Sequence, residues 1–377
     1  MGCAIVYKLV QFATTSMGQI HFKKGKFDYL DLKNKSDELS SNCSNQNEKL
    51  ALQFLSKLIK RKEEFSFFTS GSTGKPKQIY FDKKQIIQSA QSSIDVLKLK
   101  PNKEHFLICL NVENIAGAMM LVRAFCVNAN ATLLEATSNP LKNILPKHSY
   151  TFASFVPLQL QKMLTEDKTA QKKLERFENI LVGGSSINPE LEKKLATVKT
   201  KIWHTYGMTE TLSHVALRRV GKEKNFTLLP NIKAKLTDEN CLMICSPSTK
   251  NKWIETNDIV ELKGRKLKLL GRKDFVINSG GVKLIPEKIE TEIAKIVSDC
   301  NVTDCSFFIS SLPDKLLGEK VVLFIETKKS MNKKVLKTIE IGLKKMLSKY
   351  ELPKEIILKK QFVYTSNGKI DRILSKN

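Results

Sequence analysis

The sequence predicts an α/β protein with two domains, a large N-terminal domain of layered α/β sheets with a β-rich subdomain and a small C-terminal α+β domain. Three observations support this fold class. A chain of 377 residues is longer than one hydrophobic core usually supports. From about residue 65 to 205, short apolar runs alternate with helix-length segments, and closely spaced β-like segments then continue to about residue 270. We therefore expect domains at residues 1–271 and 272–377.

The first part of the chain predicts a mainly parallel sheet, because strands that are separated by helices pair in parallel. The strand candidates are 65–69, 78–81, 105–110, 132–135, 150–155, 179–182 and 201–204. The helix candidates are 49–60, 83–97, 115–128, 157–165, 171–177 and 189–198. The start of the last helix is well marked, because Asn188 is a favoured N-cap and Pro189 a favoured first helical residue.

The spacing changes after residue 205 and changes again near Gly271. The β-rich part consists of the segments 213–220, 226–229, 232–236, 241–245, 259–263 and 266–270. The small domain then begins with a helix at Pro286, whose isoleucines recur on one face at helical spacing. Its other predicted elements are strands at 306–310 and 321–327, a helix at 333–348, and strands at 355–358 and 362–364.

The charge of the chain is strongly positive but dispersed. The formal net charge is +25, from 63 basic and 38 acidic residues. Residues 272–377 contribute +8 of this excess, so neither part holds a concentrated basic stripe. Dispersed lysine gives only non-specific attraction to phosphate backbones, and we expect no specific nucleic-acid partner.

The composition also indicates the cellular compartment of the protein. No apolar stretch approaches the length of a membrane span, and the N-terminus lacks the pattern of a signal peptide. The eight cysteines are scattered without a Cys-x-x-Cys pair, which favours buried reduced thiols over disulfides or a zinc site. We expect a cytoplasmic protein without a membrane span.

The most informative motif follows the apolar run 65–68. Residues 69–77 read Thr-Ser-Gly-Ser-Thr-Gly-Lys-Pro-Lys, a loop of hydroxyl, glycine and lysine residues directly after a predicted strand. Such a loop can surround a polyphosphate with backbone N–H groups, hydroxyls and ammonium groups. It is not a Walker A loop, because Gly71 and Gly74 are too close together and Pro76 follows Lys75. The sequence therefore predicts a phosphate site of another kind.

Two motifs follow later strands of the same domain. Residues 206–211 read Tyr-Gly-Met-Thr-Glu-Thr. Tyr206 beside a glycine turn can offer a flat face to a nucleotide base, and Glu210 can bind Mg²⁺, which usually takes few carboxylates plus phosphate oxygens. The pair Gly183-Gly184 lies between a predicted strand and a helix, where glycines let the backbone approach a ligand closely. Taken alone, the hexamer is more often an ordinary strand-to-loop turn, and a tight turn explains the glycine pair at least as well as a ligand does.

Three more motifs lie toward the C-terminus. Asp258 sits between β-like segments, where it could accept hydrogen bonds from two ribose hydroxyls or form an Asx turn. Residues 271–281 combine an arginine, an aspartate two residues later, an apolar strand and a Gly-Gly turn across the predicted domain junction. Residues 365–372 include Asn-Gly-Lys, which alone is typical of a hairpin turn with a solvated lysine.

These motifs occur in the order in which one family carries them. From about Phe65 to Arg372 the chain resembles the adenylate-forming superfamily of acyl-CoA synthetases, nonribosomal-peptide adenylation domains and luciferases. The loop at 69–77 and the string at 271–281 make this resemblance specific. Within the superfamily, residues 114–124 and 277–286 are similar to the compact o-succinylbenzoate–CoA ligases of menaquinone biosynthesis.

The resemblance implies a ligase that uses ATP and Mg²⁺ to convert a small-molecule carboxylic acid into an acyl-adenylate, and then transfers the acyl group to coenzyme A. The residues that it assigns to the β- and γ-phosphates are Thr69, Ser70, Gly71, Thr73 and Lys77. It assigns adenine to Gly183, Gly184 and Tyr206, the α-phosphate to Thr209, and Mg²⁺ to Glu210. The ribose is assigned to Asp258 and Arg272.

The resemblance gives the small domain two tasks. Lys369 would bridge the acyl carboxylate and the α-phosphate during adenylation, so the small domain must close to deliver it. For thioester formation the domain would rotate about a hinge at Asp274, and the strand with Gly280 and Gly281 would then line the pantetheine tunnel. Two closed states would thus use opposite faces of one domain.

The chain departs from the family pattern in two places. Only 68 residues precede the phosphate loop, which suggests an N-terminal domain truncated relative to full-length members. The segment 111–114 reads Asn-Val-Glu-Asn where these enzymes often carry a histidine. Both differences concern the acyl pocket, so a ligase for another aryl or short acyl acid, or one that serves a carrier protein, is an alternative. A non-catalytic nucleotide- or acyl-binding module is a further alternative, against which Lys369, Glu210 and Asp258 argue together.

Overall fold

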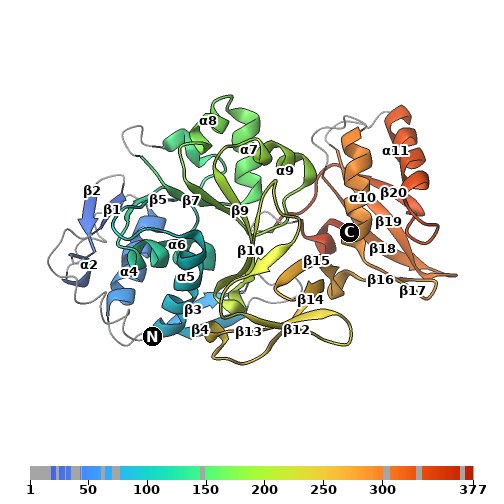
Figure 1. The fold of residues 1–377 in the computed structure, drawn as a ribbon. Coiled ribbons are helices and arrows are strands. Elements are labelled where there is room, and N and C mark those ends of the chain that lie inside the picture. The colour runs from blue at the N-terminus through green and yellow to red at the C-terminus, as the bar shows by residue number, and fades with distance from the viewer. Residues whose placement is uncertain are drawn as a thin grey trace.

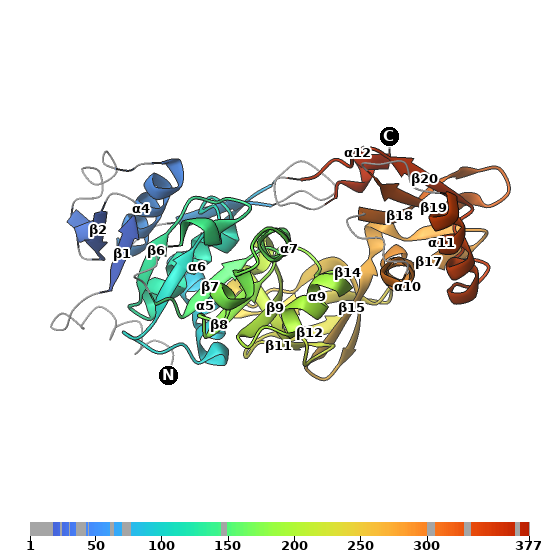
Figure 2. The same cartoon turned by 90° about the horizontal axis from the view of Figure 1, so that it is seen from above.

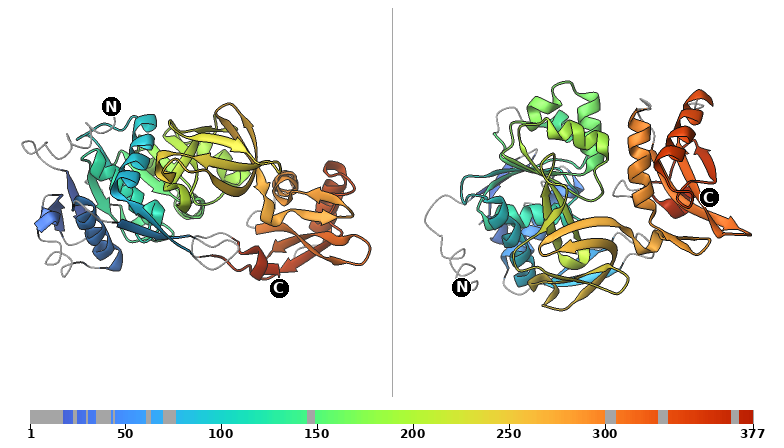
Figure 3. Two further views of the ribbon diagram at one scale, coloured as in Figure 1. Left: turned by 90° about the horizontal axis from the view of Figure 1, so that it is seen from below. Right: turned by 45° about the vertical axis from the view of Figure 1, so that its right-hand side comes forward.

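The computed structural model describes residues 18–22, 25–29, 31–34, 43, 45–60, 64–69, 77–144, 149–299, 306–327, 333–365 and 370–376. Figure 1 shows a mixed α/β fold in which a large sheet with flanking helices is followed by a smaller unit at the C-terminal end. The views in Figures 2 and 3 agree that this smaller unit lies at one end of the molecule, next to β14 (Ile254–Lys263) and β15 (Lys266–Arg272). The fold class is that predicted from the sequence.

One sheet of thirteen strands runs through the larger part of the described chain, in the order β12-β13-β14-β15-β11-β10-β9-β8-β7-β5-β6-β1-β2. Its strands before residue 210 are β1 (Gln19–Phe22), β2 (Gly25–Asp28), β5 (His105–Ile108), β6 (Asn130–Leu133), β7 (Phe152–Phe155), β8 (Asn179–Val182) and β9 (Lys201–Met208). From β1 through β6, β5, β7 and β8 to β9, every neighbouring pair is parallel. The predicted parallel pairing is confirmed for these helix-separated strands.

Helices cover both faces of the parallel part. The helices are α2 (Asp31–Asn34), α4 (Gln46–Ile59), α5 (Lys83–Leu97), α6 (Ile115–Cys126), α7 (Pro157–Glu166), α8 (Ala170–Leu174) and α9 (Pro189–Ala196). Side chains of α4, α5 and α6 belong to one buried cluster, and those of α7, α8 and α9 to another. Successive residues of β5 enter the two clusters in turn, Phe106 the first and Leu107 the second. Its residues 106–108 are therefore all apolar, as expected for a parallel strand buried on both sides.

The capping of α5 explains why its predicted bounds are correct. Asp82 accepts a hydrogen bond from the backbone of Gln85, and the Gln85 side chain bonds back to the Asp82 backbone N–H. This reciprocal arrangement satisfies two N–H groups that the helix itself leaves free. At the other end, Lys98 adopts a left-handed conformation with φ of 55° and stops the helix.

The phosphate-type loop lies on a separate hairpin. The strands β3 (Glu64–Phe68) and β4 (Gln78–Asp82) pair antiparallel in a two-stranded sheet of their own. Only residues 69–77 lie between these two strands, which is shorter than the crossover that parallel pairing needs.

The β-rich part continues the large sheet as antiparallel strands. Its members besides β14 and β15 are β10 (Ser213–Arg219), β11 (Phe226–Leu228), β12 (Lys233–Leu236) and β13 (Cys241–Cys245). Strands that carry candidate site residues are longer than the sequence predicts. β9 continues to Met208 rather than ending at 204, and β14 begins at Ile254 rather than 259. Both added stretches contain candidate site residues.

The C-terminal unit has a five-stranded sheet of its own. The strands are β16 (Ile277–Ser279), β17 (Val282–Leu284), β18 (Ser306–Asp314), β19 (Gly318–Glu326) and β20 (Glu355–Lys359). The helices α10 (Pro286–Asp299) and α11 (Lys333–Met346) pack on one face through Ile289, Ile293 and Ile339. The predicted strand at 362–364 is wrong, since only an isolated bridge between Tyr364 and Ile370 forms there, followed by α12 (Arg372–Lys376).

Two further expectations concern cysteines and membranes. The described cysteines 109, 126, 241 and 245 are free thiols, and all four are buried. Burial raises the pKa of the Cys126 thiol to about 12, which keeps it protonated and unreactive. Among the described residues, no helix is both long and apolar enough to span a membrane.

Candidate functional site

The Gly183-Gly184 turn and Tyr206 lie next to each other at the carboxyl ends of two neighbouring parallel strands. β8 pairs with β9 in a register that sets Val182 opposite His204. The turn therefore leaves β8 beside the end of β9. A Cβ on Gly183 would lie 2.3 Å from the Thr205 hydroxyl oxygen, and Gly184 has a φ of 91°. Both positions thus require glycine, one for close approach and one for backbone conformation.

Gly207 has a different role from the one predicted. It lies inside β9, where β10 pairs with it antiparallel, and not in a turn. A Cβ at this position would be 1.9 Å from the backbone oxygen of Ser213. The glycine therefore lets β9 and β10 approach closely at the position next to Tyr206.

Tyr206, Asp258 and Arg272 form one hydrogen-bonded group. The Tyr206 hydroxyl donates to one carboxylate oxygen of Asp258 at 2.6 Å, and Arg272 Nη1 donates to the other at 3.1 Å. Asp258 is opposite Arg272 in the pairing of β14 with β15. Burial, followed by the Asp258 charge, raises the pKa of Tyr206 well above its ordinary value, so the phenol stays a hydrogen-bond donor.

Arg272 also contacts the predicted hinge residue. Its Nε and Nη2 atoms donate to one oxygen of Asp274 at 3.1 and 2.6 Å. Asn257 donates to the other Asp274 oxygen at 2.7 Å. Asp274 lies in a short 3-10 turn, η4 (Lys273–Phe275), between the last strand of the large sheet and the first strand of the small one. One guanidinium therefore joins the predicted ribose-binding carboxylate to the predicted hinge.

Thr209 and Glu210 lie directly after β9, in the 3-10 turn η2 (Thr209–Thr211). A hydrogen bond from outside the turn stabilises it: the Ser248 hydroxyl donates to the backbone oxygen of Thr211 at 3.0 Å. Leu212 then leaves the turn with a φ of 54°. Glu210 is half-buried, and its carboxylate has no hydrogen-bond or ion-pair partner among the described residues.

The two ends of the phosphate-type loop are joined at the tip of the β3–β4 hairpin. The Thr69 N–H donates to the backbone oxygen of Lys77 at 2.8 Å. The Lys77 N–H in turn donates to the Thr69 hydroxyl oxygen at 3.0 Å. Ser70, Gly71 and Thr73 lie outside the described residues.

Two candidate residues of the C-terminal unit lie together on one turn. Gly280 and Gly281 connect β16 to β17 with φ values of 58° and 80°, and the Gly280 N–H donates to the Leu317 backbone oxygen at 2.9 Å. Lys369 lies outside the described residues. Arg372, three positions later, donates to Glu290 at 2.9 Å and lies 4.6 Å from the ring centre of Phe275.

The structure adds one residue that the motifs did not indicate. Arg123 of α6 is only 1% exposed and donates to Ser93 at 2.7 Å and to Nδ1 of His214 at 3.1 Å. Among the described residues it has no ion pair with an acid, and burial lowers its pKa to about 10. A buried cation without a counter-ion is costly unless a ligand supplies one. The sequence signal is an arginine inside the apolar helix 115–126, in a chain with only eight arginines.

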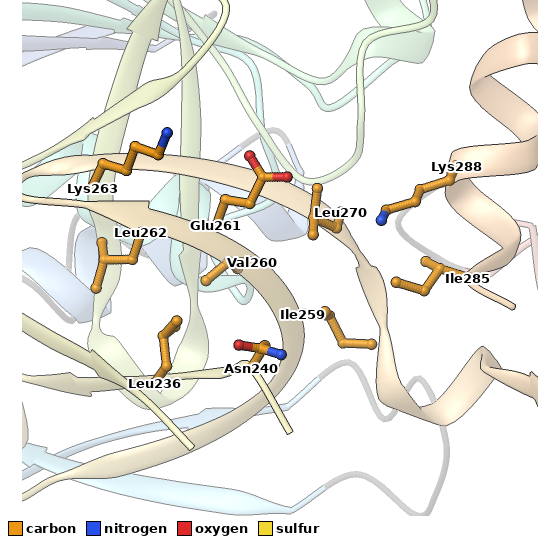
Figure 4. Close-up of a pocket in the computed structure, with 10 residues that line it drawn as sticks. All are labelled: Leu236, Asn240, Ile259, Val260, Glu261, Leu262, Lys263, Leu270, Ile285 and Lys288. Carbon is orange, nitrogen blue, oxygen red and sulfur yellow. The ribbon is translucent and has the colours of Figure 1, made fainter. Parts of the chain in front are cut away.

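A separate cavity of about 420 Å³ lies between the β-rich part and the C-terminal unit. Figure 4 shows apolar side chains of β14 and β15 on one side, with Ile285 and Lys288 of the C-terminal unit facing them. No residue of the predicted site lines this cavity.

Comparisons with known proteins agree with the geometry. A family model described as AMP-binding enzyme matches residues 30–249. The chain is 26% identical over 333 residues to a 2-succinylbenzoate–CoA ligase of Staphylococcus epidermidis, covering 81% of this chain and 68% of that protein. It is also 26% identical to a probable 2-succinylbenzoate–CoA ligase of Mycobacterium tuberculosis, with 81% of each protein covered.

Two solved structures are informative. An acyl-CoA synthetase (AMP-forming)/AMP-acid ligase II-like protein from Dyadobacter fermentans is 34% identical, with 90% of this chain and 97% of that chain covered and a TM-score of 0.59. The o-succinylbenzoate CoA synthetase of Bacillus subtilis, in complex with its acyl-adenylate intermediate, has a TM-score of 0.78. That match covers 99% of this chain and 98% of the other at 17% identity, and it shows a shared fold.

Proposed function

Because the chain belongs to the family of AMP-binding enzymes, we propose that it is an ATP-dependent acid–thiol ligase that makes an acyl-adenylate and then an acyl-CoA thioester. One observation carries this proposal: Tyr206, Asp258 and Arg272 form a hydrogen-bonded group beside the Gly183-Gly184 turn. A flat aromatic ring, a glycine backbone and a carboxylate acceptor are what an adenosine needs at its base and its ribose. We place the enzyme in the cytoplasm, where ATP and coenzyme A are available.

In this proposal the nucleotide is held by groups from several strands. Gly183, Gly184 and Tyr206 bracket adenine, and Asp258 with Arg272 holds the ribose. The Asp258 carboxylate has acceptor capacity for ribose hydroxyls beyond its two present bonds, since two oxygens offer about four lone-pair sites. The β- and γ-phosphates are bound by the loop that carries Thr69, Ser70, Gly71, Thr73 and Lys77. The α-phosphate contacts Thr209.

The residues present fit a magnesium ion. Mg²⁺ keeps several waters and usually takes one or two carboxylates plus phosphate oxygens. Glu210 offers one half-buried carboxylate with no partner among the described residues. These residues also hold no group of three or more His, Cys, Asp or Glu side chains that could form an all-protein metal site. When bound, the ion would neutralise phosphate charge, and the role of Glu210 is to hold it next to Thr209.

The chemistry has two steps that the chain's own groups must support. First, a carboxylate oxygen of the acid attacks the α-phosphorus of ATP, and the bond to the β-phosphate oxygen breaks to release pyrophosphate. Second, the thiol of coenzyme A loses its proton and attacks the acyl carbon, which releases AMP. Lys369 stabilises negative charge between the carboxylate and the α-phosphate in the first step. Positioning and charge stabilisation are the protein's main contributions.

We propose a domain boundary after residue 271, with residues 1–271 as the AMP-binding domain and 272–377 as the mobile one. The large sheet ends with β15 at Arg272, and the separate small sheet begins with β16 at Ile277. Asp274 lies between these two strands and is the proposed pivot. Rotation about it brings either Lys369 or the Gly280-Gly281 turn to the nucleotide.

For the acid we propose 2-succinylbenzoate, the substrate in the names of the relatives. This compound carries two carboxylates, of which only one is activated. The second stays ionised and needs a cationic partner when it is buried. Arg123 is such a partner, because it is buried, hydrogen-bonded to a serine and a histidine, and without an acidic neighbour among the described residues. A simple aryl or short acyl acid would leave this charge without a counter-ion.

Arg123→Leu is expected to raise KM for 2-succinylbenzoate by about 10- to 100-fold, because a hydrogen bond to a charged group contributes roughly 1.5–3 kcal/mol. KM for ATP should stay within about 2-fold, since the nucleotide groups are on other elements. Steady-state kinetics with each substrate varied in turn measures both. Arg219→Leu is the matched control, because Arg219 is a half-buried arginine of β10 whose guanidinium lies near the Trp203 ring. An unchanged KM for the diacid in Arg123→Leu would contradict the assignment.

Exchange of labelled pyrophosphate into ATP tests the proposed function directly. The purified protein is offered a panel of carboxylic acids that includes 2-succinylbenzoate, benzoate and short aliphatic acids. Exchange that depends on 2-succinylbenzoate supports the full proposal, and exchange with another acid replaces only the substrate. A ligase that passes the acyl group to a carrier protein would show exchange but no thioester with coenzyme A. Binding of ATP without exchange for any acid would indicate a non-catalytic module.

A further inference from the structure

Two buried side chains and one half-buried side chain, from three elements, form a chain of hydrogen bonds that ends on the glycine turn. These are Glu192 of α9, Arg218 of β10 and His204 of β9, and we call them the Glu192–Arg218–His204 relay. We propose that this relay is a positioning device for adenine, which fixes the distance between the Gly183–Ser186 turn and Tyr206. The inference rests on the proposed nucleotide site and adds three residues to it that do not themselves touch the nucleotide.

The contacts of the relay are continuous. Both carboxylate oxygens of Glu192 accept from Arg218, at 2.6 Å from Nη1 and 2.8 Å from Nη2. Arg218 Nε lies 3.2 Å from Nδ1 of His204, and His204 Nε2 lies 3.2 Å from the backbone oxygen of Ser185. His204 and Arg218 are 6% and 8% exposed. The bidentate ion pair fixes the guanidinium plane, and the guanidinium then fixes the imidazole.

The hydrogen-bond pattern determines the state of the imidazole. A guanidinium is only a donor, so Nδ1 of His204 must be the acceptor and carry no proton. The proton then sits on Nε2, which donates to the Ser185 carbonyl. The ring is neutral, consistent with burial and the nearby Arg218 charge lowering the pKa of His204 to about 4. A single tautomer is thus selected, and it is the one that can hold the turn.

The turn is consequently attached to β9 at two neighbouring points. Gly183 packs directly on the Thr205 side chain, and the Ser185 carbonyl is held by His204. Tyr206 follows on the same strand, and the rings of His204 and Tyr206 both lie against Phe226, with centroids 5.0 and 6.1 Å away. The two walls of the proposed adenine slot, the glycine backbone and the tyrosine ring, are therefore held in register by three consecutive residues.

Substitution of His204 distinguishes a positioning role from a purely structural one. His204→Leu keeps apolar volume but loses the donor to Ser185. His204→Gln can both accept from Arg218 and donate to Ser185, and His204→Asn is polar but too short to reach both. His105→Leu, in β5, is the matched control for loss of a half-buried histidine; its imidazole contacts Thr132.

Two ligands test the adenine end and the phosphate end of the proposed site independently. Titration calorimetry measures AMP binding, and inhibition of pyrophosphate exchange measures inorganic tripolyphosphate binding. We expect AMP to bind about 10-fold more weakly to the Leu and Asn variants, and within about 3-fold of the parent protein for Gln and for His105→Leu. Tripolyphosphate inhibition should be unchanged in all of them.

The outcomes are decisive for each variant. AMP affinity that is equal in the Asn, Gln and parent proteins overturns the inference, and so does an equal weakening of AMP and tripolyphosphate. Because the Asn and Gln variants keep a polar group at this position, they decide the question even if the Leu variant does not fold. A parent protein that binds no AMP contradicts the proposed function itself, whereas a parent that binds AMP with insensitive variants contradicts only the relay.

Discussion

Lys369→Ala is expected to lower acyl-adenylate formation by at least about 100-fold, the loss typical of removing one charge-stabilising donor from an active site. The proposed ammonium bridges the acyl carboxylate and the α-phosphate while both carry negative charge. The second half-reaction should be largely retained, because in the proposed cycle the small domain has then rotated and Lys369 no longer faces the substrate.

The two half-reactions are measured separately. Pyrophosphate exchange reports the first, and release of AMP from chemically supplied acyl-adenylate with coenzyme A reports the second. Lys360→Ala is a suitable control, because Lys360 is an exposed lysine of the same unit. Equal loss of both half-reactions in Lys369→Ala would remove the role assigned to this residue.

Asp274→Pro is expected to spare adenylation and to slow thioester formation by about 10-fold or more. Proline fixes φ near −65°, so it restricts the rotation that the proposed pivot must allow. The first turn of a helix tolerates proline because its N–H groups have no partner within the helix, and Asp274 lies in such a short turn. The substitution also removes the bonds from Arg272 and Asn257 to the Asp274 carboxylate.

Asp274→Ala separates these two effects. It removes the same carboxylate bonds but leaves the backbone free to rotate. If stiffness is the cause, the alanine variant should form thioester at a rate much closer to that of the parent protein, as followed by single-turnover assays. A proline variant with unimpaired overall turnover would show that Asp274 is not the pivot.

The regular parts of the fold could be predicted because local signals determine them. The helix 83–97 is correct at both ends, since Asp82 and Gln85 form its cap. The parallel strands are apolar on both faces and separated by helices, so they can be predicted from the sequence alone. The strand β14 was predicted too short because Thr256, Asn257 and Asp258 have the composition of a turn. The pairing of Asp258 with β15, and of Ile254 and Glu255 with β13, overrides that local preference.

The candidate site was predicted only where its residues form local motifs. Tyr206, Asp258 and Arg272 stand in recognisable strings, and the structure brings these three together. The Glu192–Arg218–His204 relay has no such signal, and the signal for Arg123 is only an arginine inside the apolar helix 115–126. His204 meets Arg218 through the antiparallel register of β9 with β10, and Glu192 comes from α9, the helix that precedes β9. Such meetings depend on tertiary geometry rather than on spacing along the chain.

The position of Arg272 implies an energetic link between nucleotide and hinge. Its guanidinium binds Asp258 on one side and Asp274 on the other, so a ribose bound at Asp258 would share that carboxylate with the cation that also contacts the proposed pivot. If bound nucleotide changes the equilibrium constant of domain rotation by some factor, rotation must change the affinity for nucleotide by the same factor. One arginine would thereby act as an occupancy sensor, and product AMP would leave most readily from the orientation that it stabilises least.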